Sequence, residues 1–160
     1  MNASDMIMSE SHAIKCELAA EVLRSSGKLR LQVTGWSMLP TVWPGDTLIV
    51  ERVDSAEVTE GEIVLFRRDR RLFVHRVVKN QSALLVTRGD SMRTPDSPVD
   101  KNEFLGRICS IVRNGRCVEP RRKLGAGERT MASLMQRSEV AARVIVGVRG
   151  LLHTSNQTVL

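Results

Sequence analysis

Through the middle of the chain, apolar residues tend to alternate with polar ones in short runs rich in valine, isoleucine and leucine. Such alternation is typical of strands with one face in a core, and glycine, aspartate and asparagine between the runs favour turns. Two runs flank the sequence Arg67-Arg68-Asp69-Arg70-Arg71 and predict a hairpin with a charged, solvent-exposed tip, while Asn114-Gly115 predicts a second hairpin turn. The pattern predicts a mainly β, antiparallel domain with strands over residues 29–33, 46–53, 62–68, 72–79, 83–88 and 104–113.

The two ends of the chain have helical periodicity instead. Residues 1–11 are polar and predicted to be disordered, and an amphipathic helix is predicted from Ser11 up to the glycine at position 27, with its apolar face on Ile14, Leu18, Val22 and Leu23. At the other end, a basic linker over residues 120–128 precedes a predicted helix whose apolar stripe runs from Met131 to Val148. The chain is therefore expected to divide into a tail and short helix (1–29), a β domain (30–119) and a linker with a short helix (120–160).

The first candidate for chemistry is Ser37, in the sequence Gly35-Trp36-Ser37-Met38-Leu39-Pro40. Glycine and proline at positions 35, 40, 44 and 45 exclude a helix here and predict a rigid turn ahead of the strand at 46–53. A serine is a weak nucleophile unless a base lies within hydrogen-bond reach. Ser37 on its own is more simply explained as an ordinary turn residue, so a catalytic role depends on finding that base.

Candidates for the base are scarce, because the sequence has three histidines, His12, His75 and His153. Of these, His75 stands in a strongly patterned strand segment. A histidine can take the serine proton near neutral pH if a carboxylate holds its tautomer. The long polar loop after residue 88 offers Asp90, Asp96 and Asp100, each of which is also a natural turn or cap residue. A lysine base would have to be desolvated, which makes Lys79 a weaker candidate.

Composition narrows the function further. Hydrophobic residues make up 42% of the 160 residues, enough for one folded domain with a core. The net charge of +6 is compatible with a solvated basic face or with anionic lipid, whereas the absence of tyrosine leaves few stacking platforms for nucleic acid. Cysteines 16, 109 and 117 lack the spacing of metal ligands and favour a reducing compartment. We therefore expect no metal, no cofactor and no nucleic-acid partner.

Several blocks of sequence, taken together and in order, resemble the S24/S26 serine peptidases, which include type I signal peptidases and the self-cleaving SOS repressors. The resemblance covers about residues 30–112. The blocks are Gly35-Trp36-Ser37-Met38-Leu39-Pro40-Thr41 with Pro44-Gly45-Asp46, Gly61-Glu62-Ile63-Val64, Val74-His75-Arg76-Val77-Val78, and Arg88-Gly89-Asp90 with Asp96, followed by Phe104-Leu105-Gly106-Arg107-Ile108. The resemblance implies the signal-peptidase/SOS-repressor type of antiparallel β domain.

Within that family, bacterial signal peptidases and SOS repressors have a lysine where this chain has His75. Endoplasmic-reticulum and archaeal signal peptidases have a histidine in a Val-His-Arg setting, which this sequence is similar to. The resemblance implies Ser37 as nucleophile, His75 as general base and Asp96, six positions after Asp90, as the orienting carboxylate, with Asp90 shaping the site. It also implies an oxyanion hole and substrate-binding surface around residues Gly35, Trp36, Met38 and Pro40, with the backbone N–H of Ser37 as a donor.

The sequence therefore predicts a serine endopeptidase of the signal-peptidase-like type that cleaves an extended peptide or preprotein. A non-catalytic peptide-binding module on the same fold and a self-processing regulator remain alternatives. The N-terminus lacks a secretory signal, and no apolar run reaches the length of a membrane span. A cytoplasmic location is expected, with peripheral membrane contact through the basic C-terminal helix as a further possibility.

Overall fold

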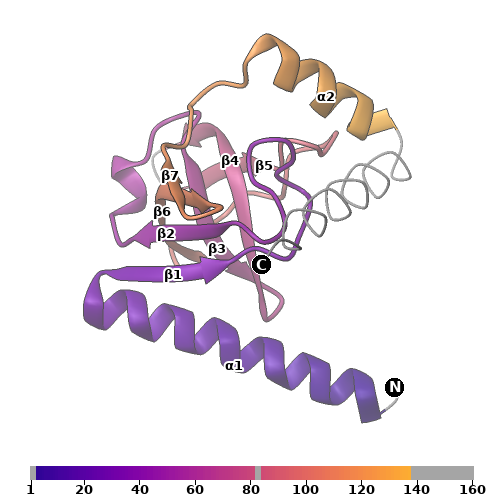
Figure 1. Cartoon of the computed structure of the whole chain (residues 1–160). Coiled ribbons are helices and arrows are strands. Elements are labelled where there is room, and N and C mark those ends of the chain that lie inside the picture. The colour runs from indigo at the N-terminus through magenta and orange to yellow at the C-terminus, as the bar shows by residue number, and fades with distance from the viewer. Residues whose placement is uncertain (1–2, 82–83, 138–160) are drawn as a thin grey trace, which may run out of the picture.

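The computed structural model describes residues 3–81 and 84–137, which form an antiparallel β-sheet with a helix at each end (Figure 1). The strands follow one another in the sheet in the order β1-β2-β6-β3-β4-β5, and β7 also pairs with β6. The bounds of the first six lie within two residues of the predicted ones: β1 Lys28–Gln32, β2 Thr47–Glu51, β3 Ile63–Arg68, β4 Arg71–Gln81, β5 Leu84–Arg88 and β6 Phe104–Arg113. Strand β7 (Arg116–Val118) is the second arm of the hairpin predicted at Asn114-Gly115. The prediction of a mainly β domain with terminal helices is confirmed.

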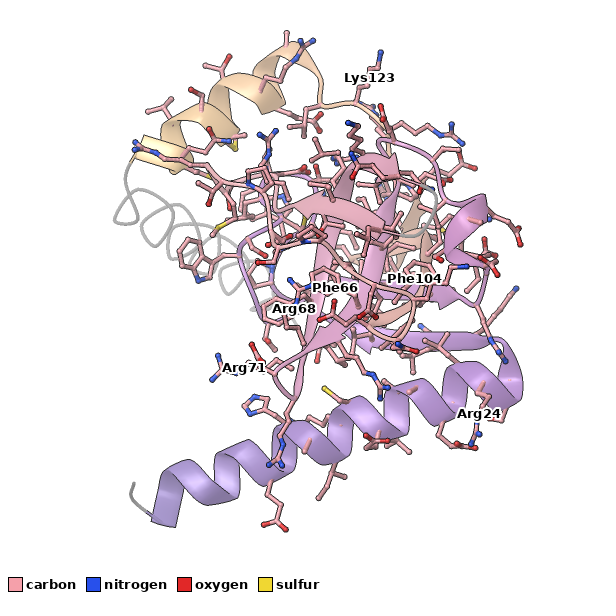
Figure 2. The ribbon with its side chains drawn as sticks, turned by 180° about the vertical axis from the view of Figure 1, so that it is seen from behind. Arg24, Phe66, Arg68, Arg71, Phe104 and Lys123 are labelled. Carbon is pink, nitrogen blue, oxygen red and sulfur yellow. The ribbon has the colours of Figure 1, made fainter. Side chains whose placement is uncertain are left out.

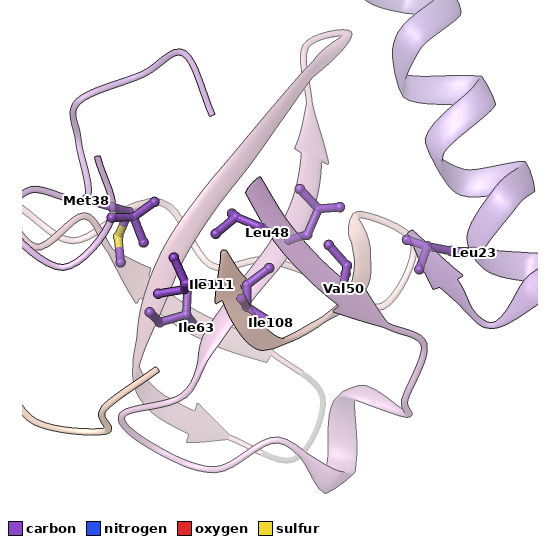
Figure 3. Close-up of a cluster of buried hydrophobic side chains, with 9 residues drawn as sticks. Leu23, Met38, Leu48, Val50, Ile63, Ile108 and Ile111 are labelled. Carbon is purple, nitrogen blue, oxygen red and sulfur yellow. The ribbon is translucent and has the colours of Figure 1, made fainter. Parts of the chain in front are cut away.

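Strand β3 lies at the centre of the core because both of its faces are buried. Ile63 and Leu65 point into a cluster that also receives residues from β2, β6 and the end of the N-terminal helix (Figure 3). Val64 and Phe66 point to the opposite face and pack in a second cluster with residues of β4 and β5. A strand buried on both faces reads as a continuous apolar run, as β3 does.

Two tight turns connect neighbouring strands. Asp69 and Arg70 have φ angles of 49° and 60° between β3 and β4, and Asn114 and Gly115 have φ angles of 51° and 74° between β6 and β7. Two consecutive residues in the left-handed region match the twist of the flanking strands, which suits two-residue hairpins. Both predicted hairpins are therefore present. The predicted charged tip is not exposed throughout. The guanidinium of Arg68 lies over the Phe66 ring, whereas Arg71 is nearer the exposed end of the hairpin (Figure 2).

The N-terminal helix α1 (Ala3–Ser26) corrects two expectations. It begins at Ala3, so the prediction of a disordered segment was wrong for residues 3–11, and the helix is longer than predicted. Its docked face consists of Cys16, Ala19 and Leu23, whereas Ile14 and Leu18 of the predicted apolar face are each 62% exposed. The small Cys16 and Ala19 side chains suit close packing of the helix on β1, β4 and β6.

The C-terminal helix α2 (Ala126–Arg137) begins inside the segment that was predicted to be a linker. Glu128 accepts a hydrogen bond from the backbone N–H of Gly125 at 2.7 Å, which satisfies a donor at the start of the helix. Ala132 and Met135 are buried, while Met131 and Leu134 are exposed. The predicted continuation of the apolar stripe to Val148 lies outside the described residues. No helix in the part of the chain that the structure describes is long and apolar enough to span a bilayer.

Candidate active site

Ser37 lies in the turn that joins β1 to β2. The backbone N–H of Leu39 donates to the carbonyl of Trp36, and that of Val42 donates to the carbonyl of Met38, so the turn is closed upon itself. Met38, Leu39 and Val42 are buried and fix the turn on the core. Of the residues expected to contact substrate, the side chains of Met38 and Pro40 are therefore buried, whereas Gly35 and Trp36 are exposed next to Ser37.

His75 is carried by β4 and is 4% exposed. Its ring packs against two phenylalanines, with centroid distances of 5.9 Å to Phe66 and 6.0 Å to Phe73. Its Nε2 atom lies 3.0 Å from the Oγ atom of Ser37, which is hydrogen-bond distance. The strand and the two aromatic rings thus fix the imidazole with one nitrogen directed at the serine.

Asp96 comes from the long loop between β5 and β6 and reaches the other side of the imidazole. Its Oδ2 atom lies 2.6 Å from Nδ1 of His75. Burial acts to raise the pKa of Asp96, but hydrogen bonds from His75 and Thr87, together with the charges of His75 and Arg68, hold that pKa below its ordinary value. The carboxylate therefore stays ionised, and an Nδ1–H donating to it leaves Nε2 free to accept the proton of Ser37.

Residues 3–109, more than half of the chain, match the model of a family described as Peptidase S24-like. The chain belongs to the peptidase S24-like family. This membership implies serine peptidase or self-cleavage activity. A search among curated proteins found no match.

The carboxylate of Asp90 in this S24-like peptidase is held by side chains that reach it from other segments. It was predicted to cap a turn through nearby backbone N–H groups. Instead, Arg76 donates to it from Nε and from Nη2, both at 2.8 Å, and the Thr41 hydroxyl also donates to it. Because the Asp90 side chain is 4% exposed, its charge needs a full set of donors, which an arginine fork supplies. The pair links β4, the turn of residues 36–42 that carries Ser37 (the Ser37 turn) and the loop after β5.

A second ion pair also holds the Ser37 turn. Arg113, at the end of β6, donates to both carboxylate oxygens of Asp46, whose side chain is 4% exposed. The same guanidinium donates to the backbone carbonyl of Thr41 at 2.8 Å. Thr41 is thus held by Arg113 through its carbonyl and by Asp90 through its hydroxyl, so the turn is fixed on both flanks.

The sequence contains a second Gly-X-Ser-Met stretch, at residues 89–92, and the structure distinguishes it from the first. Ser91 is 5% exposed, and its hydroxyl lies 2.9 Å from the carbonyl oxygen of Ser37, where it is a donor. The backbone N–H of Ser91 donates to that same carbonyl at 3.0 Å. Ser91 therefore holds the backbone of Ser37 and is not presented to substrate.

The remaining candidates lie apart from this arrangement. Asp100 accepts backbone N–H groups of residues 102 and 103 and caps a turn. Lys79 pairs with Val86 beyond a bulge in β4 and is exposed. His153 lies outside the described residues, and no group of metal ligands occurs among the described ones.

The contacts of Arg68 escaped prediction, because arginines in a charged hairpin look solvated. Arg68 donates to both oxygens of Glu103 and to the carbonyls of Ser97 and Pro98, and thereby holds the loop of Asp96 against the hairpin.

The helix α2 packs on the two loops of the site. Met135 covers Leu39 and Trp43 in a small cluster of its own. Gln136 donates to the backbone carbonyl of Asp90 at 3.3 Å, and Arg93 donates to the carbonyl of Gln136. The helix therefore stabilises both the Ser37 turn and the loop after β5.

Proposed function

We propose that this chain is a serine endopeptidase of the histidine-type, signal-peptidase-like kind, which cleaves an extended peptide. The observation that carries the proposal is His75, which contacts Ser37 through one ring nitrogen at 3.0 Å and Asp96 through the other at 2.6 Å. Ser37 Oγ attacks the scissile carbonyl while His75 Nε2 takes the serine proton, and His75 returns that proton to the leaving amine as the C–N bond breaks. Water, deprotonated by His75, then attacks the acyl group and releases it from Ser37, which regains its proton. Asp96 holds the tautomer and stabilises the imidazolium.

Backbone N–H groups support the stabilisation of the oxyanion. Within the described chain, the N–H groups of Ser37 and Met38 have no hydrogen-bond acceptor. Two free donors at the nucleophile are the usual composition of an oxyanion hole, and removal of one such donor typically costs on the order of a hundredfold in turnover. The buried Met38 side chain keeps its own backbone in place for this task.

An open sheet edge next to Ser37 supports an extended substrate. Strand β5 pairs with β4 only from Arg76 onward, so residues 71–75 have a strand partner, β3, on one side only among the described residues. The N–H and C=O groups of Val77 form hydrogen bonds on the side of β3. Because successive residues of a strand direct these groups to opposite sides, the N–H and C=O groups of Val74 and Leu72 point to the open edge. A peptide that adds as a strand there would end at Ser37 and His75.

Cleavage of a peptide library tests this proposal without a known substrate. The protein is incubated with peptides from a digested proteome, and new termini are identified by mass spectrometry. Wild type is compared with Ser37→Ala and with a matched control, Ser97→Ala, which changes an exposed serine on the loop of Asp96. Ser37→Ala should lose all specific cleavages, whereas Ser97→Ala should keep them. Identical cleavage by wild type and Ser37→Ala would refute the assignment of the nucleophile.

Self-processing is a second candidate, favoured by the match to the S24-like family. Intact-mass measurements on the purified chain over time distinguish the two. Fragments that form in wild type and not in Ser37→Ala support self-processing, and mixing the two proteins shows whether one copy cuts another. Peptide binding without any cleavage would instead indicate a non-catalytic binding module.

A further inference from the structure

Thr87, on β5, is a polar residue that is completely buried, with an exposure of 0%. Its hydroxyl donates to Oδ2 of Asp96 at 2.7 Å, and its backbone carbonyl accepts the N–H of Asp96 at 2.8 Å. The residue thus holds Asp96 through both the side chain and the backbone. Since a buried hydroxyl is costly unless it is hydrogen-bonded, this pairing with Asp96 also satisfies Thr87 itself.

The atom that Thr87 holds is the one that His75 uses. Oδ2 of Asp96 accepts from Nδ1 of His75 at 2.6 Å and from Thr87 at 2.7 Å. His75 and Thr87 lie on neighbouring paired strands, with Val77 of β4 opposite Thr87. A carboxylate on a loop can rotate about its side-chain bonds, but two donors fixed on adjacent strands define one position for this oxygen.

We propose that Thr87 is a positioning residue for catalysis, acting through Asp96 as the fourth member of a Ser37–His75–Asp96–Thr87 chain. The proposal rests on the proposed function. Thr87 is buried and touches no substrate. Without its hydroxyl, Oδ2 rotates away from Nδ1, and the imidazole then populates the tautomer that carries its proton on Nε2. That tautomer cannot accept the proton of Ser37, so turnover falls while substrate binding is unchanged.

The test compares Thr87→Val, which keeps the branched shape and removes the hydroxyl, with Thr87→Ser, which keeps the hydroxyl. Thr130→Val is the matched control, because the exposed Thr130 hydroxyl donates only within α2. With the best-cleaved library peptide, Thr87→Val should lower kcat about tenfold or more at unchanged KM, as expected for loss of a hydrogen bond to a charged group. Thr87→Ser should restore most of kcat, and Thr130→Val should resemble wild type.

A second measurement needs no substrate. In proton NMR, an Nδ1–H in a short hydrogen bond to a carboxylate resonates far downfield, and His75→Gln assigns the signal. Thr87→Val should lose this signal and Thr87→Ser should keep it. The proposal is overturned if Thr87→Val has wild-type kcat and keeps the signal. It is also overturned if neither Thr87→Val nor Thr87→Ala folds, because the role of Thr87 would then be structural. Absence of cleavage by wild type counts against the proposed function alone, since the NMR arm still reports on Thr87.

Discussion

The two aspartates of the long loop should respond differently when each is changed to asparagine. Asp90→Asn breaks a buried pair in which the Asp90 side chain is 4% exposed and that of Arg76 is 12% exposed. Loss of one partner of a buried pair costs about 3–5 kcal/mol. Asparagine keeps the shape and one acceptor, but its amide group then meets the donors of Arg76, so we expect about 3 kcal/mol. At about 2–4 °C per kcal/mol for a domain of this size, Tm should fall by about 6–12 °C.

Asp96→Asn should leave Tm within about 3 °C of wild type, since its side chain is 23% exposed and the amide can keep the local geometry. Turnover should fall on the order of ten-thousandfold, because an amide that donates to Nδ1 selects the wrong tautomer of His75. Calorimetry gives the Tm of both variants, and cleavage of a library peptide gives their turnover. Asp100→Asn, on the same loop, is the control. A fully active Asp96→Asn beside a folded, inactive Asp90→Asn would refute the assignment and reverse the roles.

Two further predictions concern steric contact and thiol reactivity. A Cβ atom at Gly89 would lie 2.6 Å from the carbonyl oxygen of Ser37, so Gly89→Ala should displace Ser37 and lower turnover by about a hundredfold. Gly127→Ala in α2, where a Cβ atom meets nothing within 4 Å, should not lower turnover. Equal losses in a turnover assay would exclude the contact with Ser37 as the cause. The exposed Cys117 should react first with a thiol reagent. Cys16 is buried, and burial is the main cause of its raised pKa, so it should react only in denaturant. Equal labelling rates of the two cysteines, measured by mass spectrometry, would contradict the packing of α1.

The sheet could be predicted from the sequence because alternation of apolar and polar residues is the direct signature of a half-buried strand. The start of α1 could not. A helix that docks at Cys16, Ala19 and Leu23 can extend toward its N-terminus through good helix formers such as Ala3 and Met6, and propensity alone does not predict how far it extends. Periodicity therefore located the helix but not where it begins, nor which of its faces is docked.

Some residues of the candidate site could be predicted from the sequence and others could not. The sequence alone predicted three site residues, Ser37, His75 and Asp96, because each stands in a recognisable motif. The structure brings the three within hydrogen-bond distance. Thr87 and Arg113 carry no such signal. A threonine in a strand is ordinary, and an arginine before a turn reads as solvated, so their buried hydrogen bonds become visible only when distant segments meet.

The Ser37 turn is held by Arg113, which is 67 residues away from its partner Asp46. During synthesis, a growing chain contains Ser37, His75 and Asp96 well before Arg113 has been added at the end of β6. One flank of the turn then has no guanidinium to hold it, and β6, which pairs with both β2 and β3, is incomplete. The turn is thus expected to reach its final geometry late in biosynthesis, when β6 completes the sheet.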